Sequence, residues 1–205
     1  MIEMTKFSLS FLKSFLYIEK LFFENNSVYL ITGENGCGKT TFIRSILRIN
    51  TDYCGEILIE GKNITSMSRK EIAKIVSYLP QTANFNFPME AEDFIKQAFY
   101  SSTNSFFDEV IELLALKEYL KKNILELSGG ERQLVRIARS FVPDVRYTIL
   151  DEPDTFLSKK NKEKLIELIK KFSKKRSIII VSHSEKEFDF IENVINIEKY
   201  ITYRE

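Results

Sequence analysis

The sequence predicts an α/β fold whose central sheet is mainly parallel and covered by helices on both faces. Short apolar segments with strand character alternate with segments of helical periodicity, and one block over residues 90–122 is helical throughout. This alternation is typical of parallel sheets, because a helix must return the chain to the same edge of the sheet between strands. The helical block is predicted to be a subdomain inserted into the sheet domain.

The first half of the chain is predicted to be rich in strands. Residues 6–11 alternate polar and apolar side chains like a half-buried strand, and Asn25 and Asn26 form a turn after a second extended segment. Ser68 followed by Glu71 has the pattern of a capping box and predicts a helix start. The predicted strands are 6–11, 15–23, 27–32, 55–61 and 76–79, and the predicted helices are 39–49 and 68–74.

The second half of the chain begins with the helical block, where Phe94, Ile95, Ala98 and Phe99 recur at helical spacing. Strands and helices alternate again after it. The predicted helices are 130–141, 159–174 and 184–191, and the predicted strands are 147–150, 177–181 and 194–197.

Composition narrows the classes of function. The 205 residues include 30 basic and 29 acidic ones, a net charge of +1 that gives no electrostatic case for a nucleic-acid partner. The apolar runs are far shorter than the roughly 18 residues of a membrane span, so a partner would have to hold the chain at a membrane. The N-terminus does not resemble a signal peptide. Cys37 and Cys54 do not form a metal-type pair, and they predict a reducing, intracellular compartment.

A glycine-rich loop follows the strand over residues 27–32. Its sequence, GENGCGKT over residues 33–40, fits the phosphate-binding pattern G-x-x-x-x-G-K-[ST]. Glycines let the loop turn its N–H groups onto phosphates, Lys39 supplies a charge for the β- and γ-phosphates, and Thr40 offers a hydroxyl to Mg²⁺. The sequence therefore predicts binding of ATP with Mg²⁺. The residues assigned to nucleotide binding in this segment are Gly33, Glu34, Asn35, Gly36, Cys37, Gly38, Lys39, Thr40 and Thr41.

Two acidic residues follow the apolar strand YTIL. In enzymes with a phosphate loop, an acid at such a strand end holds Mg²⁺, which makes Asp151 a metal-ligand candidate alongside Thr40. Glu152 is one residue further on and is the candidate that orients or deprotonates the attacking water.

Three further segments give the chain its resemblance to a family. LSGGERQLVRIARS, starting at Leu127, resembles the signature motif of ABC transporter ATPases, and Gln81 in YLPQ resembles their Q-loop glutamine. His183 in IIIVSHS resembles their switch histidine. With the phosphate loop and the YTILDE strand, these motifs stand in the order of that family. The resemblance covers nearly the whole chain.

The resemblance implies a mechanism and a set of partners. Two ATPase subunits, identical or different, would pair head to tail, with ATP between the phosphate loop of one and Ser128, Gly129 and Gly130 of the other. Gln81 would reach Mg²⁺ and the water, Glu152 would act as the general base, and His183 would contact the γ-phosphate. Closure around ATP would drive transmembrane permease subunits, and the chain would be cytoplasmic and peripheral on the inner face of the cell membrane.

The resemblance also implies an architecture. It predicts a phosphate-loop sheet core of the ABC ATPase type with an antiparallel N-terminal β subdomain and an inserted helical subdomain. Residues 1–81 and 127–205 would form the core with its β subdomain, and residues 82–126 would form the helical subdomain that docks on the permease.

The sequence departs from the family pattern after the catalytic acid. The family usually has E-P-T-x-x-L-D there, whereas this chain has Asp154 at the threonine position and Ser158 at the final aspartate, which puts the cross-dimer contact of that aspartate in doubt. The family also stacks adenine on an aromatic residue before the phosphate loop. Phe11 is the first candidate for this contact and Phe15 the second.

Direction and cargo have more than one interpretation. The stretch KEIAKIVSYLPQ resembles importers of iron chelates, metals or cobalamin and favours import slightly, while the chain length also suits an exporter ATPase. One alternative is a soluble ABC ATPase of DNA repair, against which stand the near-neutral charge and the lack of a coiled-coil or zinc insertion. Another is a regulatory ATP-binding module, against which Glu152 and His183 stand.

Overall fold

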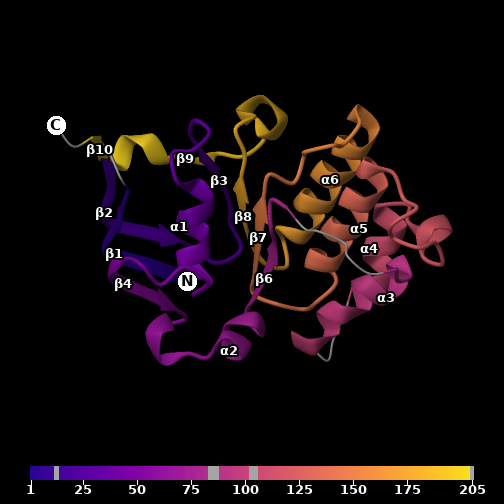
Figure 1. The fold of residues 1–205 in the computed structure, drawn as a ribbon, viewed down its shortest axis with the longest axis horizontal. Helices are drawn as coiled ribbons and strands as arrows, with labels where there is room; N and C mark the ends of the chain where they lie inside the picture. Colours follow the sequence, from indigo (N-terminus) through magenta and orange to yellow (C-terminus); the bar gives the residue numbers. More distant parts are fainter. Residues whose placement is uncertain (12–13, 83–87, 102–105, 204–205) are drawn as a thin grey trace.

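The computed structural model describes residues 1–11, 14–82, 88–101 and 106–203. Two sheets and two groups of helices form successive layers (Figure 1). The antiparallel sheet lies at one end, and helix α1 (Lys39–Ile46) separates it from the parallel sheet. The far face of the parallel sheet is covered by the helices α3 (Ala91–Lys96), α4 (Phe107–Leu113), α5 (Gly129–Phe141) and α6 (Lys159–Phe172). The fold therefore has the mainly parallel, doubly covered sheet that the sequence predicts.

The parallel sheet has the strand order β6-β7-β8-β3-β9. Every residue of β7 and β8, two of its three inner strands, is buried, as expected for strands covered on both faces. Its strands are β3 (Val28–Thr32), β6 (Val76–Leu79), β7 (Tyr147–Asp151), β8 (Ser177–Val181) and β9 (Asn193–Asn196).

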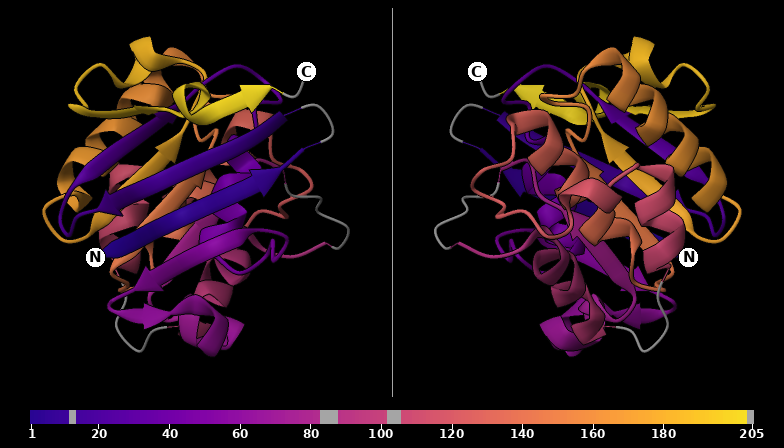
Figure 2. Two further views of the ribbon diagram at one scale, coloured as in Figure 1. Left: turned by 90° about the vertical axis from the view of Figure 1, so that its left-hand side faces the viewer. Right: turned by 90° about the vertical axis from the view of Figure 1, so that its right-hand side faces the viewer.

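The antiparallel sheet has the strand order β10-β2-β1-β4-β5 and faces the viewer on the left of Figure 2. Strand β1 pairs along its length with β2, from Ile2 opposite Phe23 to Ser10 opposite Phe15. The last strand, β10, was not predicted, because three residues carry too short a pattern to indicate a strand. The strands are β1 (Ile2–Ser10), β2 (Ser14–Phe23), β4 (Cys54–Ile59), β5 (Lys62–Asn63) and β10 (Ile201–Tyr203).

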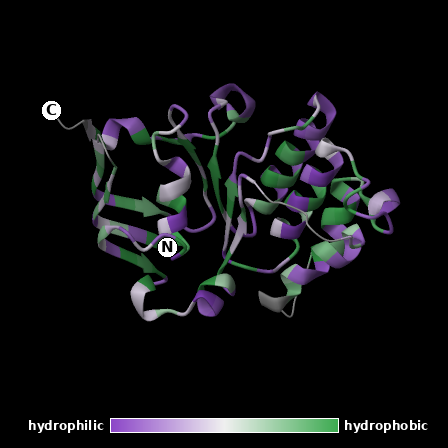
Figure 3. Cartoon of the chain, in the orientation of Figure 1, coloured by the Kyte–Doolittle hydropathy of each residue, from purple (hydrophilic) through white to green (hydrophobic). Residues whose placement is uncertain are grey.

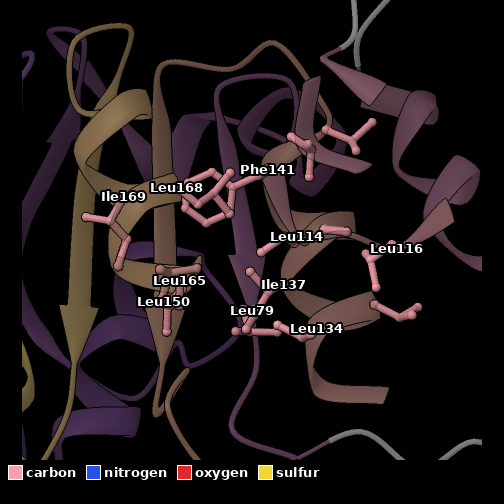
Figure 4. Close-up of a cluster of buried hydrophobic side chains, with 14 of the residues drawn as sticks. Leu79, Leu114, Leu116, Leu134, Ile137, Phe141, Leu150, Leu165, Leu168 and Ile169 are labelled. Atoms are coloured by element: carbon pink, nitrogen blue, oxygen red, sulfur yellow. The ribbon is translucent and has the colours of Figure 1, made fainter. Parts of the chain in front are cut away.

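Two apolar cores lie on the two faces of the parallel sheet. Helix α1 (Lys39–Ile46) contributes Phe42, Ile43 and Ile46 to a core shared by both sheets. The other core lies between the parallel sheet and the helices, and Figure 4 shows Phe141, Leu165 and Leu168 among its side chains. Apolar residues follow the strands of both sheets, and polar residues follow the outer helix surfaces (Figure 3).

Most of the remaining helices are shorter than the sequence predicts, whereas α5 (Gly129–Phe141) covers the whole predicted range 130–141. The described part of the block over 90–122 contains α3 (Ala91–Lys96), α4 (Phe107–Leu113) and the 3-10 helices η2 (Gln97–Ser101) and η3 (Lys117–Tyr119), while residues 102–105 of that prediction lie outside the described residues. The predicted helix over 184–191 is wrong, because only a 3-10 turn, η4 (Glu185–Phe188), forms where too few apolar residues recur to bury a longer helix. The others are α2 (Arg69–Ala73), α5 (Gly129–Phe141), α6 (Lys159–Phe172), η1 (Ile64–Ser66) and η5 (Ile197–Tyr200). None of the described helices is both long and apolar enough to cross a bilayer.

Candidate nucleotide-binding site

The phosphate loop joins β3 to α1, and its glycines have the backbone angles that the pattern requires. Gly38 is the N-cap of α1 with φ of 101°, and Gly33 has φ of 145°. Both are also tightly packed, since a Cβ on Gly38 would lie 2.6 Å from the Phe11 ring and one on Gly33 would lie 2.8 Å from Cys37 Sγ. No side chain caps the α1 N-terminus, whereas Ser128 and Ser158 cap α5 and α6. The first N–H groups of α1 are thus left for a ligand.

Lys39 is a buried cation, only 6% exposed. Its ammonium donates to the carbonyl oxygens of Gly33, at 2.6 Å, and Glu34, at 2.8 Å. Within the described residues it has no carboxylate partner at ion-pair distance. A buried positive charge without a counter-ion is costly, so the loop is suited to an anionic ligand such as a phosphate group.

Asp151 lies at the end of β7 and is fully buried. One carboxylate oxygen accepts from Thr40 Oγ1 at 3.2 Å and the other accepts from Tyr78 Oη at 3.3 Å. Burial raises the pKa of Asp151, and these hydrogen bonds oppose the rise. Burial beside Asp151 also raises the pKa of Tyr78 to about 12, which keeps its hydroxyl protonated as a donor. The adjacent hydroxyl and carboxylate oxygens are hard donors of the type that Mg²⁺ prefers.

Glu152 and His183 contact each other. Glu152 Oε2 lies 2.8 Å from His183 Nδ1, and the Glu152 side chain is 6% exposed against 55% for His183. Glu152 has φ of 51°, a left-handed conformation that is rare for a residue with a side chain. Its N–H donates to the Val181 carbonyl at 2.8 Å, which joins the ends of β7 and β8 at this point.

A cavity of about 570 Å³ brings many of the predicted residues together. The carboxyl end of β7, the phosphate loop and the start of α1 surround it, and Phe11 lines it while Phe15 pairs with Ser10 and Thr202 in the antiparallel sheet. Thr155 also lines it and was not predicted, although it lies only three residues after Glu152. The lining residues are Phe11, Asn35, Gly36, Gly38, Lys39, Thr40, Thr41, Gln81, Glu152, Thr155 and His183.

Other predicted residues do not line this cavity. Gly33, Glu34 and Cys37 shape the loop behind it, and Asp151 reaches it through Thr40. Ser128, Gly129 and Gly130 are elsewhere, at the start of α5. Ser128 Oγ accepts from Glu131 N at 3.3 Å while the Glu131 carboxylate accepts from Ser128 N at 2.7 Å, a complete capping box.

The two residues after Glu152 that depart from the family pattern, Asp154 and Ser158, form hydrogen bonds within their own chain. Asp154 is 7% exposed and accepts from Ser182 Oγ at 3.3 Å. Ser158 is the N-cap of α6, and its hydroxyl accepts from Asn161 N at 3.4 Å. Both residues therefore make their contacts within the chain that carries them.

Replacing Ser158 tests its role as a helix cap. We expect Ser158→Ala to reduce the free energy of unfolding by about 1 kcal/mol, because an N–H at the start of α6 loses its acceptor. Ser158→Asp keeps a capping oxygen, and its negative charge interacts favourably with the positive end of the helix dipole. This variant should therefore be at least as stable as the parent chain. Thermal unfolding of both variants measures this, and equal stability of the alanine variant and the parent would contradict it.

A comparison with protein families decides the identity of the fold. The family model described as ABC transporter matches residues 20–155. This chain belongs to the ABC transporter family. The family that the five sequence motifs indicate, the predicted fold class and the assignment to the ABC-type ATPases are confirmed.

Related ABC proteins differ in the direction of transport that their names give. An uncharacterized ABC transporter ATP-binding protein of Haemophilus influenzae is 29% identical, over 89% of this chain and 74% of that protein. The iron(3+)-hydroxamate import ATP-binding protein FhuC of Bacillus subtilis is 31% identical over 75% of this chain and 61% of its own length. A putative export ATP-binding/permease protein of Rickettsia felis is 28% identical over 82% of this chain and 31% of its length. The chain thus spans less than two thirds of these last two relatives.

Solved structures of ABC cassettes have the same fold. A putative ABC transporter ATP-binding protein from Pyrococcus furiosus is 25% identical, with a TM-score of 0.81 and coverage of 98% of this chain and 99% of that one. A bacterial ABC transporter cassette solved as a dimer has a TM-score of 0.82 at 20% identity, covering 96% of this chain and 94% of that one.

Proposed function

We propose that this chain binds and hydrolyses ATP in the cavity around Lys39 and thereby powers an ABC transporter. The observation that carries the proposal is that one cavity is lined by Lys39, Glu152 and His183, so that phosphate-binding and hydrolytic groups face the same space. Phosphate release by the purified chain, compared with its Glu152→Gln variant, tests it. Absence of ATP turnover by the parent chain under any Mg²⁺ concentration would overturn it.

In this proposal each residue at the cavity has a role that follows from its position. Lys39 and the α1 N-terminus bind the phosphates, Thr40 and Asp151 hold Mg²⁺ with help from Gln81, and Phe11 packs against adenine. Bound Mg²⁺ would neutralise charge on the phosphate oxygens as the terminal phosphoryl group leaves. Glu152 accepts a proton from the attacking water, and His183 holds one oxygen of Glu152 while its exposed ring is available to the γ-phosphate.

A second ATPase subunit is proposed because the signature-motif residues do not line the cavity of their own subunit. Ser128, Gly129 and Gly130 are uncommitted to the cavity of their own subunit, so a head-to-tail dimer would bring them to the cavity of the other. Phe156 strengthens this proposal. It is 75% exposed, has φ of 65°, and its carbonyl oxygen lies 3.1 Å from the position of a Cβ on Gly130. A large apolar side chain held out beside the signature motif is suited to burial against a partner.

Truncating Phe156 tests this dimer contact. In a Glu152→Gln background with ATP, we expect Phe156→Ala to raise the dimer dissociation constant about tenfold or more, because an aromatic anchor at an interface is lost. The ATP affinity of the monomer should not change, since Phe156 does not line the cavity. Light scattering over a concentration series measures the dimer, and Phe156→Leu is the matched apolar control. An unchanged dissociation constant for the alanine variant would exclude Phe156 from the interface.

The permease would dock on a second hollow, between α2, β6, η2 and α5. It is lined mainly by apolar residues, including Leu47, Ile49 and Ile72. Its charged lining residues among those described are Arg69, Lys70 and Arg139, all basic, which favours a helical segment with apolar and acidic residues. In this proposal the helical subdomain, residues 82–126, meets the core, residues 1–81 and 127–205, at this hollow, and both contribute to docking. The permease keeps the chain at the inner face of the cell membrane.

Import of an iron chelate, metal or cobalamin is the direction we favour. It is supported by the stretch over residues 70–81 and by the similarity to the B. subtilis import protein. Export remains the alternative, supported by the similarity to the R. felis protein.

A further inference from the structure

Two buried polar residues of α5 connect the segments that carry Gln81 and Glu152. Gln133 is 2% exposed and Arg136 is 8% exposed, and their spacing puts them on one face of the helix. Arg136 Nη1 donates to Gln133 Oε1 at 2.7 Å, and Arg136 Nη2 donates to the Pro80 carbonyl. Gln133 Nε2 donates to the Pro153 carbonyl at 3.0 Å. A continuous chain of hydrogen bonds thus joins the residue before Gln81 to the residue after Glu152.

Stability alone does not account for an arginine here. The neighbouring α5 residues Leu134, Val135 and Ile137 are buried and apolar. Burial lowers the pKa of Arg136, and in the described part of the chain no carboxylate lies at ion-pair distance from it. A buried charge of this kind costs more than a packed apolar side chain of similar volume. What the arginine supplies is a pair of directed donors.

The two acceptors are well suited to fixing the backbone. Proline has a restricted φ and no N–H, so its carbonyl is its one backbone hydrogen-bonding group. The Pro80 carbonyl shares a peptide plane with the N–H of Gln81, so holding that oxygen orients the backbone that enters Gln81. Pro153 is bonded directly to Glu152, whose φ of 51° is a strained conformation that surrounding contacts must maintain.

We propose that Arg136 and Gln133 are positioning residues that set Gln81 and Glu152 relative to each other for ATP hydrolysis. This inference rests on the proposed function. Neither side chain lines the cavity. Both therefore act through the two prolines and should affect turnover far more than ATP binding.

A double-mutant cycle in steady-state ATP hydrolysis tests the link to Gln81. We expect Arg136→Met to lower kcat about tenfold to a hundredfold, the cost of a small misplacement of catalytic groups, while KM for ATP stays within about twofold. In a Gln81→Ala background the same change should lower kcat less than about threefold, because the group that it positions is already missing. An equal fold loss in both backgrounds overturns the link. Arg146→Met is the control, since Arg146 is an exposed arginine paired with Glu60 and should leave kcat unchanged.

Two conservative variants separate positioning from folding. Arg136→Lys keeps the charge but only one donor direction, so its kcat should lie between those of the parent and Arg136→Met. Gln133→Glu keeps the contact with Arg136 as an ion pair but loses the donor to Pro153, so kcat should fall without a lower Tm. If kcat fell in proportion to Tm across Arg136→Met, Arg136→Lys and Gln133→Glu, the role of the two residues would be structural and the inference would fail. If the parent chain hydrolysed no ATP at all, the proposed function would fail instead.

Discussion

Lys39→Ala should abolish tight binding of ATP, with a loss of about a hundredfold or more in affinity. The ammonium is the one charged group of the phosphate loop that lines the cavity, and charge-assisted hydrogen bonds of this kind contribute about 1.5–3 kcal/mol each. The Lys39 ammonium donates to carbonyls of its own loop, so its removal deletes a buried charge and leaves the core packing intact. Titration with Mg-ATP in a calorimeter measures the affinity.

Two further variants make the Lys39 result specific. Lys39→Met retains the apolar stem and should lose ATP binding as fully as the alanine variant, which separates charge from packing. Lys70→Ala removes a lysine outside the cavity and should bind ATP like the parent chain. Affinity unchanged in both Lys39 variants would refute the phosphate-loop assignment.

Glu152→Gln should retain ATP and stop its hydrolysis, which would trap the closed dimer. The amide has the shape of the carboxylate and can keep the contact with His183, but it cannot accept the proton of the attacking water. Loss of a general base lowers turnover about 10² to 10⁴-fold. Size-exclusion chromatography with light scattering, with and without ATP, follows the shift from monomer to dimer, and phosphate release measures turnover.

The control for this variant is Glu185→Gln, which removes an exposed acid two residues from His183 that does not line the cavity. It should hydrolyse ATP at the parent rate. Near-normal hydrolysis by Glu152→Gln would assign the general base to another residue. A monomer with and without ATP would mean that the subunits require the permease to pair.

The parts of the site that can be predicted from the sequence are those defined by short sequence motifs. The phosphate loop and the β7 acids are each defined within eight residues by local backbone needs, so the sequence indicates Lys39, Thr40, Asp151 and Glu152 without a fold. The weakest predictions were the helix over 184–191 and the unbroken block over 90–122. In both, apolar spacing suggested more helix than tertiary packing maintains.

The sequence by itself determined the class of this protein, because motifs at fixed spacing and alternating periodicity depend on neighbouring residues. Only the tertiary structure decided which distant groups meet. In the folded chain Phe11, and not Phe15, lines the cavity, and Thr155 lines it as well. Arg136 and Gln133 connect the Pro80 and Pro153 carbonyls by hydrogen bonds. These contacts connect segments far apart in the chain, and they depend on how α5 packs across the ends of β6 and β7, which no local pattern encodes.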